Sequence, residues 1–143
     1  MWREGDNIGI GCRTSFVLGL DLDVDGAGRN VLATLAASLG EPWLDTLTVT
    51  TPSGGAHLYF RVPPACSLAS VSGGRTALGP GIDIRGPGRG SGGYLIGPGS
   101  IVNGFRCTIE CDLPVAPLPA WVADLLAAGA QRPRWLDLAA GSR

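Results

Sequence analysis

The sequence contains no lysine and only one histidine, and its charges nearly cancel. The net charge is −1, with arginine supplying all the permanently cationic side chains. A domain that grips nucleic acid through the phosphate backbone usually carries a basic surplus, because neutralising phosphates drives that affinity. Any contact of this chain with DNA is therefore expected to be weak or to need help from another component.

Long hydrophobic runs are also missing. No window holds the roughly 18 to 20 consecutive apolar residues that a membrane span needs. The first residues, MWREGD, do not form the apolar stretch of a secretory signal. We therefore expect a cytoplasmic protein that does not enter a membrane.

Cysteine is scarce, and its spacing does not favour a zinc site. Cys107 and Cys111 are four residues apart, whereas a zinc site normally needs two such pairs or one pair with histidines. Free cysteines are usually buried. The four cysteines are therefore expected to be reduced residues of the core.

The chain does contain enough apolar material for one folded domain, 1–143. The 45% hydrophobic fraction argues against disorder, and 23 glycines with 11 prolines divide the chain into short elements. Strands are predicted at 7–12, 15–23, 46–51, 56–62, 82–85, 93–96 and 105–110, helices at 29–39 and 119–128, and a surface loop at 67–80. This order predicts an α+β fold with a mostly antiparallel sheet and helices packed on one face.

Two acids stand at the end of the strongest predicted strand. Asp21 and Asp23 follow an apolar run, and residues two apart on a strand share a face about 6 to 7 Å apart. Hard cations such as Mg²⁺ or Mn²⁺ take carboxylate oxygens of this kind together with substrate phosphates. The alternatives are a polar strand end leading into a turn and a calcium loop, although the final glutamate of such a loop is missing.

A small-residue turn precedes the only histidine. In Ser53-Gly54-Gly55-Ala56-His57, the glycines let the backbone approach a ligand, and successive N–H groups in such a turn can cradle an anion. His57 could then donate a hydrogen bond to a phosphate oxygen. The alternative is an ordinary hairpin turn followed by an exposed histidine.

A third polar pair lies on a later short strand. Asp83 and Arg85 share one face of 82–85, and Ile82 and Ile84 share the other. Asp83 could complete a metal site, and the planar fork of Arg85 suits a phosphate. Alternatively, the two side chains neutralise each other at the surface, which contributes only about 0–1 kcal/mol.

Taken together, the three elements favour nucleotide chemistry. Three carboxylates that bind two metal ions would activate a 3′-hydroxyl and stabilise a leaving pyrophosphate. Each element alone has a simpler explanation, but fewer simple explanations account for all three in this order.

The ordered motifs resemble the bifunctional DNA primase/polymerase (Prim-Pol) domain of plasmids, phages and prophages, within the archaeo-eukaryotic primase superfamily. The matching segments are NIGIGC, FVLGLDLDVDG, TPSGGAHLYFR, GIDIRGPGRGSGGYLIGPGS and APLPAWVADLL, which together span about 6–128 and leave a tail at 129–143. The resemblance implies a catalytic core like the sheet of an RNA-recognition motif, with helices behind it. It also implies a DNA primase and polymerase activity that uses NTPs or dNTPs.

The resemblance assigns roles to the motif residues. Asp21, Asp23 and Asp83 match the acids that bind Mg²⁺ or Mn²⁺ and carry catalysis. His57 matches the histidine that contacts the phosphates of the incoming nucleotide, and Ser53, Gly54 and Gly55 shape its turn. Arg85 occupies a position that is often basic in the family. The implied partners are dNTP or NTP, a DNA template and a replicative helicase.

The chain also departs from the family pattern. Members usually carry a further N-terminal α/β unit upstream of the NIGIGC segment, and this chain begins almost at that segment. The expected core thus lacks a unit that helps to cover the sheet and bind template. Three hypotheses follow: a metal-dependent nucleotidyltransferase, a non-catalytic nucleotide-binding remnant, and a metal-dependent phosphohydrolase that uses the same acids.

Overall fold

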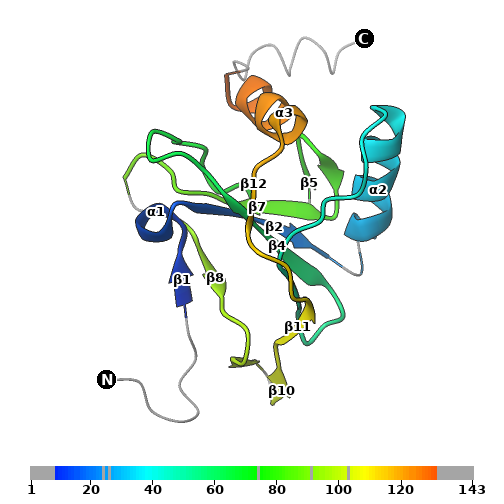
Figure 1. The fold of residues 1–143 in the computed structure, drawn as a ribbon, viewed down its shortest axis with the longest axis vertical. Helices are drawn as coiled ribbons and strands as arrows, with labels where there is room; N and C mark the ends of the chain where they lie inside the picture. Colours follow the sequence, from blue (N-terminus) through cyan, green and yellow to red (C-terminus); the bar gives the residue numbers. More distant parts are fainter. Residues whose placement is uncertain are drawn as a thin grey trace.

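The chain folds around a six-stranded sheet with two long helices on one side (Figure 1). The structure is a computed structural model that describes residues 9–131 apart from positions 24, 26, 74, 91 and 103. Its helices are α1 (Cys12–Ser15), α2 (Gly28–Ser38) and α3 (Ala120–Gln131). Its strands are β1 (Gly9–Gly11), β2 (Val17–Leu22), β3 (Thr48–Thr50), β4 (Ala56–Arg61), β5 (Arg75–Thr76), β6 (Gly79–Pro80), β7 (Ile82–Arg85), β8 (Tyr94–Ile96), β9 (Ile101–Val102), β10 (Phe105–Arg106), β11 (Thr108–Cys111) and β12 (Ala116–Pro117).

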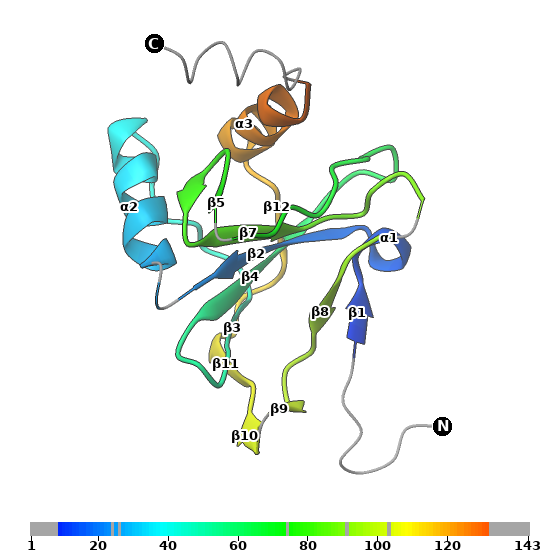
Figure 2. The same ribbon diagram turned by 180° about the vertical axis from the view of Figure 1, so that it is seen from behind.

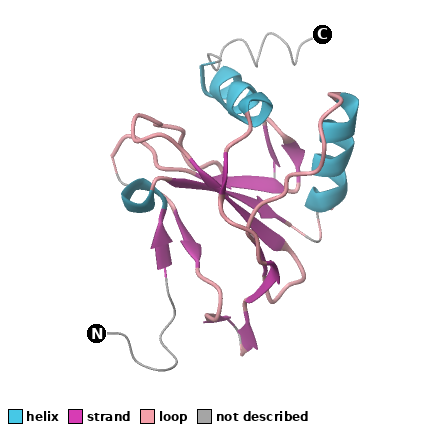
Figure 3. Cartoon of the chain, viewed as in Figure 1, coloured by secondary structure: helices cyan, strands magenta, loops and turns pink. Residues whose placement is uncertain are grey.

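The main sheet has the strand order β11-β3-β4-β2-β7, and β12 pairs with β4. Every pairing in it is antiparallel except the short parallel pairing of β12 with β4. Helix α2 connects β2 to β3, and β4 lies between these two strands. Figure 3 shows the strands at the centre of the molecule and the helices around them.

Alternation along β2 and its neighbours builds the main core on one face of the sheet. Leu18, Leu20 and Leu22 point to the same side and are at most 1% exposed. They pack with leucines, isoleucines and phenylalanine of β4 and β7, and with Leu32 of α2 and Val122 of α3. We call this side the helix face.

The other side of the sheet, which we call the open face, carries Gly19 and Asp21 of β2 and His57 and Tyr59 of β4. The antiparallel pair β1–β8 covers only one part of it (Figure 2). Leu95 of β8 fills the space over Gly19, where an added Cβ would lie 2.5 Å from its Cδ1. A second, smaller core of Cys12, Val17, Val49, Tyr59, Leu95 and Cys107 forms there.

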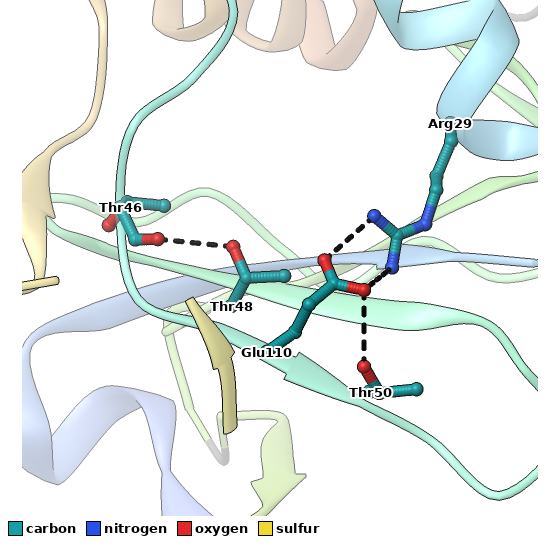
Figure 4. A network of polar contacts seen from close by, with 5 residues as sticks. All are labelled: Arg29, Thr46, Thr48, Thr50 and Glu110. Atoms are coloured by element: carbon teal, nitrogen blue, oxygen red, sulfur yellow. Dashed lines mark hydrogen bonds and ion pairs between the residues drawn. The ribbon is translucent and has the colours of Figure 1, made fainter. Parts of the chain in front are cut away.

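Helix α2 follows the periodicity of its apolar residues. Leu32 and Ala36 face the sheet, and the helix stops before Gly40, whose φ of +70° suits glycine. An exposed ion pair ties the start of α2 to the edge strand β11. Arg29 donates to both carboxylate oxygens of Glu110 at 2.7 and 2.9 Å, and Thr50 Oγ1 donates to the same carboxylate (Figure 4).

The predicted α+β fold with a mostly antiparallel sheet is confirmed, and the strands predicted at 46–51 and 56–62 form the antiparallel pair of β3 and β4. The strand predicted at 15–23 begins only at Val17, because Cys12–Ser15 forms the turn of α1 and Phe16 ends it in the left-handed region. The strand predicted at 105–110 is divided into β10 and β11. The loop predicted at 67–80 contains the β5–β6 pair. The first part of the strand predicted at 7–12 and the tail from 132 lie outside the described residues.

All four cysteines are free thiols, as expected; Cys12 and Cys107 are buried, whereas Cys66 and Cys111 are partly exposed. In the described part of the chain, no helix is both long and apolar enough to cross a membrane.

Candidate functional site

Asp21 is at the centre of the polar part of the open face. In the antiparallel register, it pairs with His57 of β4 on one side and with Asp83 of β7 on the other. Side chains directly opposite each other on adjacent strands have Cβ atoms about 4.5–5.5 Å apart. Strand pairing therefore brings together three residues that are far apart in sequence.

Nitrogen atoms of two side chains lie near the Asp21 carboxylate. Its Oδ1 lies 3.4 Å from Nε2 of His57, and its Oδ2 lies 3.7 Å from a terminal guanidinium nitrogen of Arg85. The Asp21 side chain is 28% exposed, so a ligand can reach it from solvent. The sequence left open whether Arg85 neutralises Asp83 or is free to bind a phosphate; in the structure, Arg85 forms an ion pair with Asp21.

His57 is buried, so the alternative of an exposed histidine after the turn is wrong. The residue is 8% exposed. Its Nδ1 is buried and has no hydrogen-bond partner among the described residues. A buried polar atom without a partner is costly, by about 1–3 kcal/mol, and such atoms often mark binding sites. His57 therefore has one nitrogen toward Asp21 and another that a ligand or water would satisfy.

The turn before His57 has the close backbone packing that its glycines allow. Gly54 has a φ of +88°, and its N–H donates to Thr51 O at 3.0 Å. A Cβ on Gly55 would lie 2.4 Å from Leu22 O, so only glycine fits against the end of β2. Ser53 is exposed, and its hydroxyl lies 3.2 Å from that of Thr51. The turn thus brings Ser53 beside the strand end that carries the acids.

Asp23 lies just beyond β2 and is exposed. Its backbone N–H donates to Gly81 O at 2.8 Å, and its carbonyl accepts from the N–H of Gly28 at 2.9 Å. Its Oδ1 accepts from the N–H of Asp25 at 3.0 Å. The backbone of Asp23 is therefore fixed between β7 and α2, and its carboxylate turns toward the loop.

A cleft of about 610 Å³ opens over this part of the sheet. The cleft is lined by four of the predicted site residues, Asp21, Ser53, His57 and Arg85, but not by Asp23, Gly54, Gly55 or Asp83. Its other walls are Thr51, Pro52, Ser70, Gly93, Tyr94, Leu95, Ile96 and Cys107. Tyr94, Leu95, Ile96 and Cys107 were not predicted as site residues, because β8 and the segment before β11 reach the cleft only through tertiary pairing.

The smaller core beside the cleft holds its ionisable groups neutral. Burial raises the pKa of the Cys12 thiol from 9.0 to about 11, and the pKa of the Tyr59 phenol from 10.0 to about 12. Burial also raises the pKa of Cys107. Tyr59 donates its O–H to Ile96 O at 3.0 Å and so holds β8 over the sheet. These groups support the cleft and carry no charge near neutral pH.

The three acids carry the carboxylate oxygens that a hard divalent cation takes. Asp21 and Asp83 lie opposite each other on the adjacent strands β2 and β7, where two like charges are unfavourable unless positive charge is nearby. Among the described residues, no three His, Cys, Asp or Glu side chains are grouped closely enough to hold a metal ion. The structure therefore brings together two of the three predicted acids, and Asp23 lies at the adjacent strand end.

Comparison with known proteins gives one result for most of the chain. The model of a family described as "Bifunctional DNA primase/polymerase, N-terminal" (Prim-Pol) matches residues 1–121. The matched range includes every predicted site residue, from Asp21 to Arg85. No curated protein matches the chain.

Proposed function

The chain belongs to the bifunctional DNA primase/polymerase family, and from that premise we propose that it is a metal-dependent nucleotidyltransferase that extends nucleic acid on a DNA template. The observation that best supports this activity is the register of Asp21 with both His57 and Asp83. It sets the Asp21 carboxylate beside Asp83 and beside His57, a phosphate-binding type of side chain, and Asp21 and His57 line an open cleft. The proposed setting is plasmid, phage or prophage replication, beside a replicative helicase.

We assign Asp21, Asp23 and Asp83 as the ligands of Mg²⁺ or Mn²⁺. When bound, a pair of such ions supplies activation of the attacking 3′-hydroxyl and neutralisation of the leaving pyrophosphate. His57 and Arg85 lie beside the Asp21 carboxylate, and the Arg85 guanidinium offsets its charge. If a cation bound Asp21, both side chains would lose these contacts and would be available to phosphate.

His57, Arg85 and the turn are assigned to the triphosphate of the incoming nucleotide. Arg85 can hold a phosphate through two parallel N–H donors, and His57 can donate a further N–H. Ser53 lines the same cleft, and Gly54 and Gly55 shape the turn that carries it. The volume of about 610 Å³ suits a ligand of nucleotide size.

Nucleotide binding is tested by thermal unfolding with Mn²⁺ and a dNTP. At ligand concentrations near 100 times Kd, the wild type is expected to unfold about 5 to 10 °C higher. Asp21→Asn and Asp83→Asn should each remove this shift. Asp45→Asn, an exposed acid outside the cleft, should keep it. An unchanged melting temperature of the wild type would overturn the proposal.

Turnover is tested by primer extension on a DNA template with Mn²⁺ and dNTPs. Extension by the wild type and its loss in Asp21→Asn support the nucleotidyltransferase. Binding without extension would instead favour the non-catalytic nucleotide-binding domain. Phosphate release from a nucleotide without DNA would favour the phosphohydrolase.

A further inference from the structure

A second groove lies at the opposite end of β2 from Asp21. Its volume is about 340 Å³. Three side chains stand out in it: the cations Arg13 and Arg89 and the aromatic ring of Phe16. The remaining lining is Val62, Pro63, Pro64, Ala65, Cys66, Ser67, Pro87 and Gly88.

The groove concentrates positive charge in a chain whose charges otherwise nearly cancel. Arg13 and Arg89 are exposed, and no acidic residue belongs to the described lining. One guanidinium nitrogen of Arg13 donates to Gly88 O at 3.2 Å, which steadies the side chain across the groove. Guanidinium groups have five N–H donors, so Arg13 keeps donors for an anion.

Phe16 offers an aromatic face at the same place. It is 47% exposed although the neighbouring Val17 and Leu18 are buried. Its backbone is in the left-handed region, with φ of 53° and ψ of 47°, where it ends α1. A bulky residue pays about 1–3 kcal/mol for this conformation, and such strain often occurs at ligand-binding segments. The strained turn directs the ring into the groove and away from the core.

Two other cavities of the described chain carry an exposed aromatic residue beside an acid. Trp43, 39% exposed, lines a smaller cavity with Glu41 and Asp45, which repel phosphate. Tyr94, 68% exposed, lines the cleft with Asp21 as well as Arg85. The groove of Phe16 differs from both, because its described lining contains two arginines and no acid.

The groove is connected to the candidate site through shared backbone. Gly88 and Arg89 line the groove, and Gly93 and Tyr94 line the cleft over Asp21. The N–H of Cys12, next to Arg13, donates to Gly93 O at 2.9 Å. A chain-like ligand lying in the groove would therefore pass along the border of the cleft.

We propose that this groove binds a single strand of nucleic acid. A base stacks on Phe16, and phosphates on either side bind Arg13 and Arg89. Aromatic stacking and arginine contacts of this kind bind single strands without regard to sequence. The inference rests on the proposed function, which requires a template strand near the cleft.

The test is the anisotropy of a fluorescently labelled oligothymidylate titrated with the full chain. Phe16→Ala is expected to weaken binding about tenfold, the usual scale for one stacked base. The double variant Arg13→Ala/Arg89→Ala should reduce the slope of log K against log salt by about 1.4, since each phosphate contact of a single strand contributes about 0.7.

Two matched variants serve as controls. Trp43→Ala removes an exposed aromatic residue outside the groove, and Arg106→Ala removes an exposed arginine that also donates to a glycine carbonyl, Gly99 O. Both should bind the oligonucleotide like the wild type. Equal weakening by the groove variants and these controls would overturn the proposal.

The increase in melting temperature with Mn²⁺ and a dNTP distinguishes this inference from the proposed function. The groove variants should keep that shift, which also shows that they are folded. A wild type that binds dNTP but no oligothymidylate overturns the groove and leaves the nucleotide site standing. If the wild type shows neither binding event, both proposals fail.

Discussion

The two faces of the central sheet differ in how closely they are covered. On the helix face, Leu20 and Leu22 are at most 1% exposed beneath α2 and α3. On the open face, Asp21 of the same strand is 28% exposed between His57 and Arg85. One strand therefore supplies both the core and the site, because its successive side chains point to opposite sides.

This difference separates stability from function along a single strand. The helix face consists of apolar contacts, and burial of apolar surface dominates folding free energy. The open face carries charged side chains whose pairs are partly solvated and contribute little to stability. Substitutions one residue apart should therefore have different consequences.

The largest expected effect comes from comparing Leu20 with Asp21. Leu20→Ala leaves a cavity under the helices and should lower the free energy of unfolding by about 2–5 kcal/mol. Asp21→Asn should change it by no more than about 1 kcal/mol. Urea denaturation of the two variants measures this. Similar destabilisation by both would show that the faces are not separable.

The next largest effect is expected at the contact between the start of α2 and the residue before β7. A Cβ on Gly28, the first residue of α2, would lie 2.2 Å from Gly81 O. Gly28→Ala should therefore push α2 away from β7 and cost about 1–3 kcal/mol. Because the N–H of Gly28 donates to Asp23 O, it should also weaken the Mn²⁺–dNTP shift.

Gly90→Ala is the matched control, since an added Cβ there meets nothing within 4 Å. Its melting temperature and its shift with Mn²⁺ and dNTP should equal those of the wild type. If Gly28→Ala behaves in the same way, then the close contact with Gly81 does not position Asp23.

The sequence predicted the helix face better than the open face. The apolar alternation of β2 and the helical spacing at 31, 32, 35, 36 and 39 depend on local side-chain patterns, which a single sequence shows. The turn of α1 was missed because four residues carry too little periodicity to separate a helical turn from the start of a strand.

Alternation along one strand predicted which residues of the candidate site share a face. The side of Asp83 and Arg85 followed from alternation alone, but their neighbours depend on strand order and register. For that reason, the ion pair of Arg85 with Asp21, the burial of His57 and the contribution of Tyr94 to the cleft were not predictable.

A smaller effect concerns the second core, on the open face. Tyr59→Phe removes the hydrogen bond to Ile96 O and should cost about 0.5–1.5 kcal/mol near neutral pH. Burial raises the pKa of Tyr59 to about 12, so the folded state holds this proton more tightly than the unfolded state. Its stabilisation is complete below the ordinary pKa of 10.0 and is lost as pH rises through about 12.

Urea denaturation at rising alkaline pH measures this loss. Tyr59→Phe should lose less stability than the wild type above about pH 10, because it has no phenol at position 59 to ionise. Cys12, with a pKa raised to about 11, should contribute a separate loss that persists in the variant. Identical alkaline slopes in both proteins would rule out Tyr59 as a source of the pH dependence.

The smallest expected effect is at the Arg29–Glu110 pair, which joins the helix face to the edge strand (Figure 4). The hydrogen bond from Arg29 lowers the pKa of Glu110 below its ordinary 4.5. The resulting stabilisation is present above that ordinary value and is lost as pH falls through the lower folded value. Because the side chains are 39% and 42% exposed, solvent screens the pair and it should contribute less than about 1 kcal/mol.

A double-mutant cycle with Arg29→Gln and Glu110→Gln isolates this pair from other acids. Near neutral pH, each single variant should be slightly less stable than the wild type, and the double variant little worse than either. The coupling should vanish in acid and shrink in high salt, since both remove the charge interaction. A coupling that survives acid would instead assign the contact to packing of the Arg29 stem over β11. In that case, apolar contacts alone would stabilise the helix face as far as its edge. A charge-dependent coupling would instead make the pair of Arg29 and Glu110 the one electrostatic contribution to that face among the contacts described.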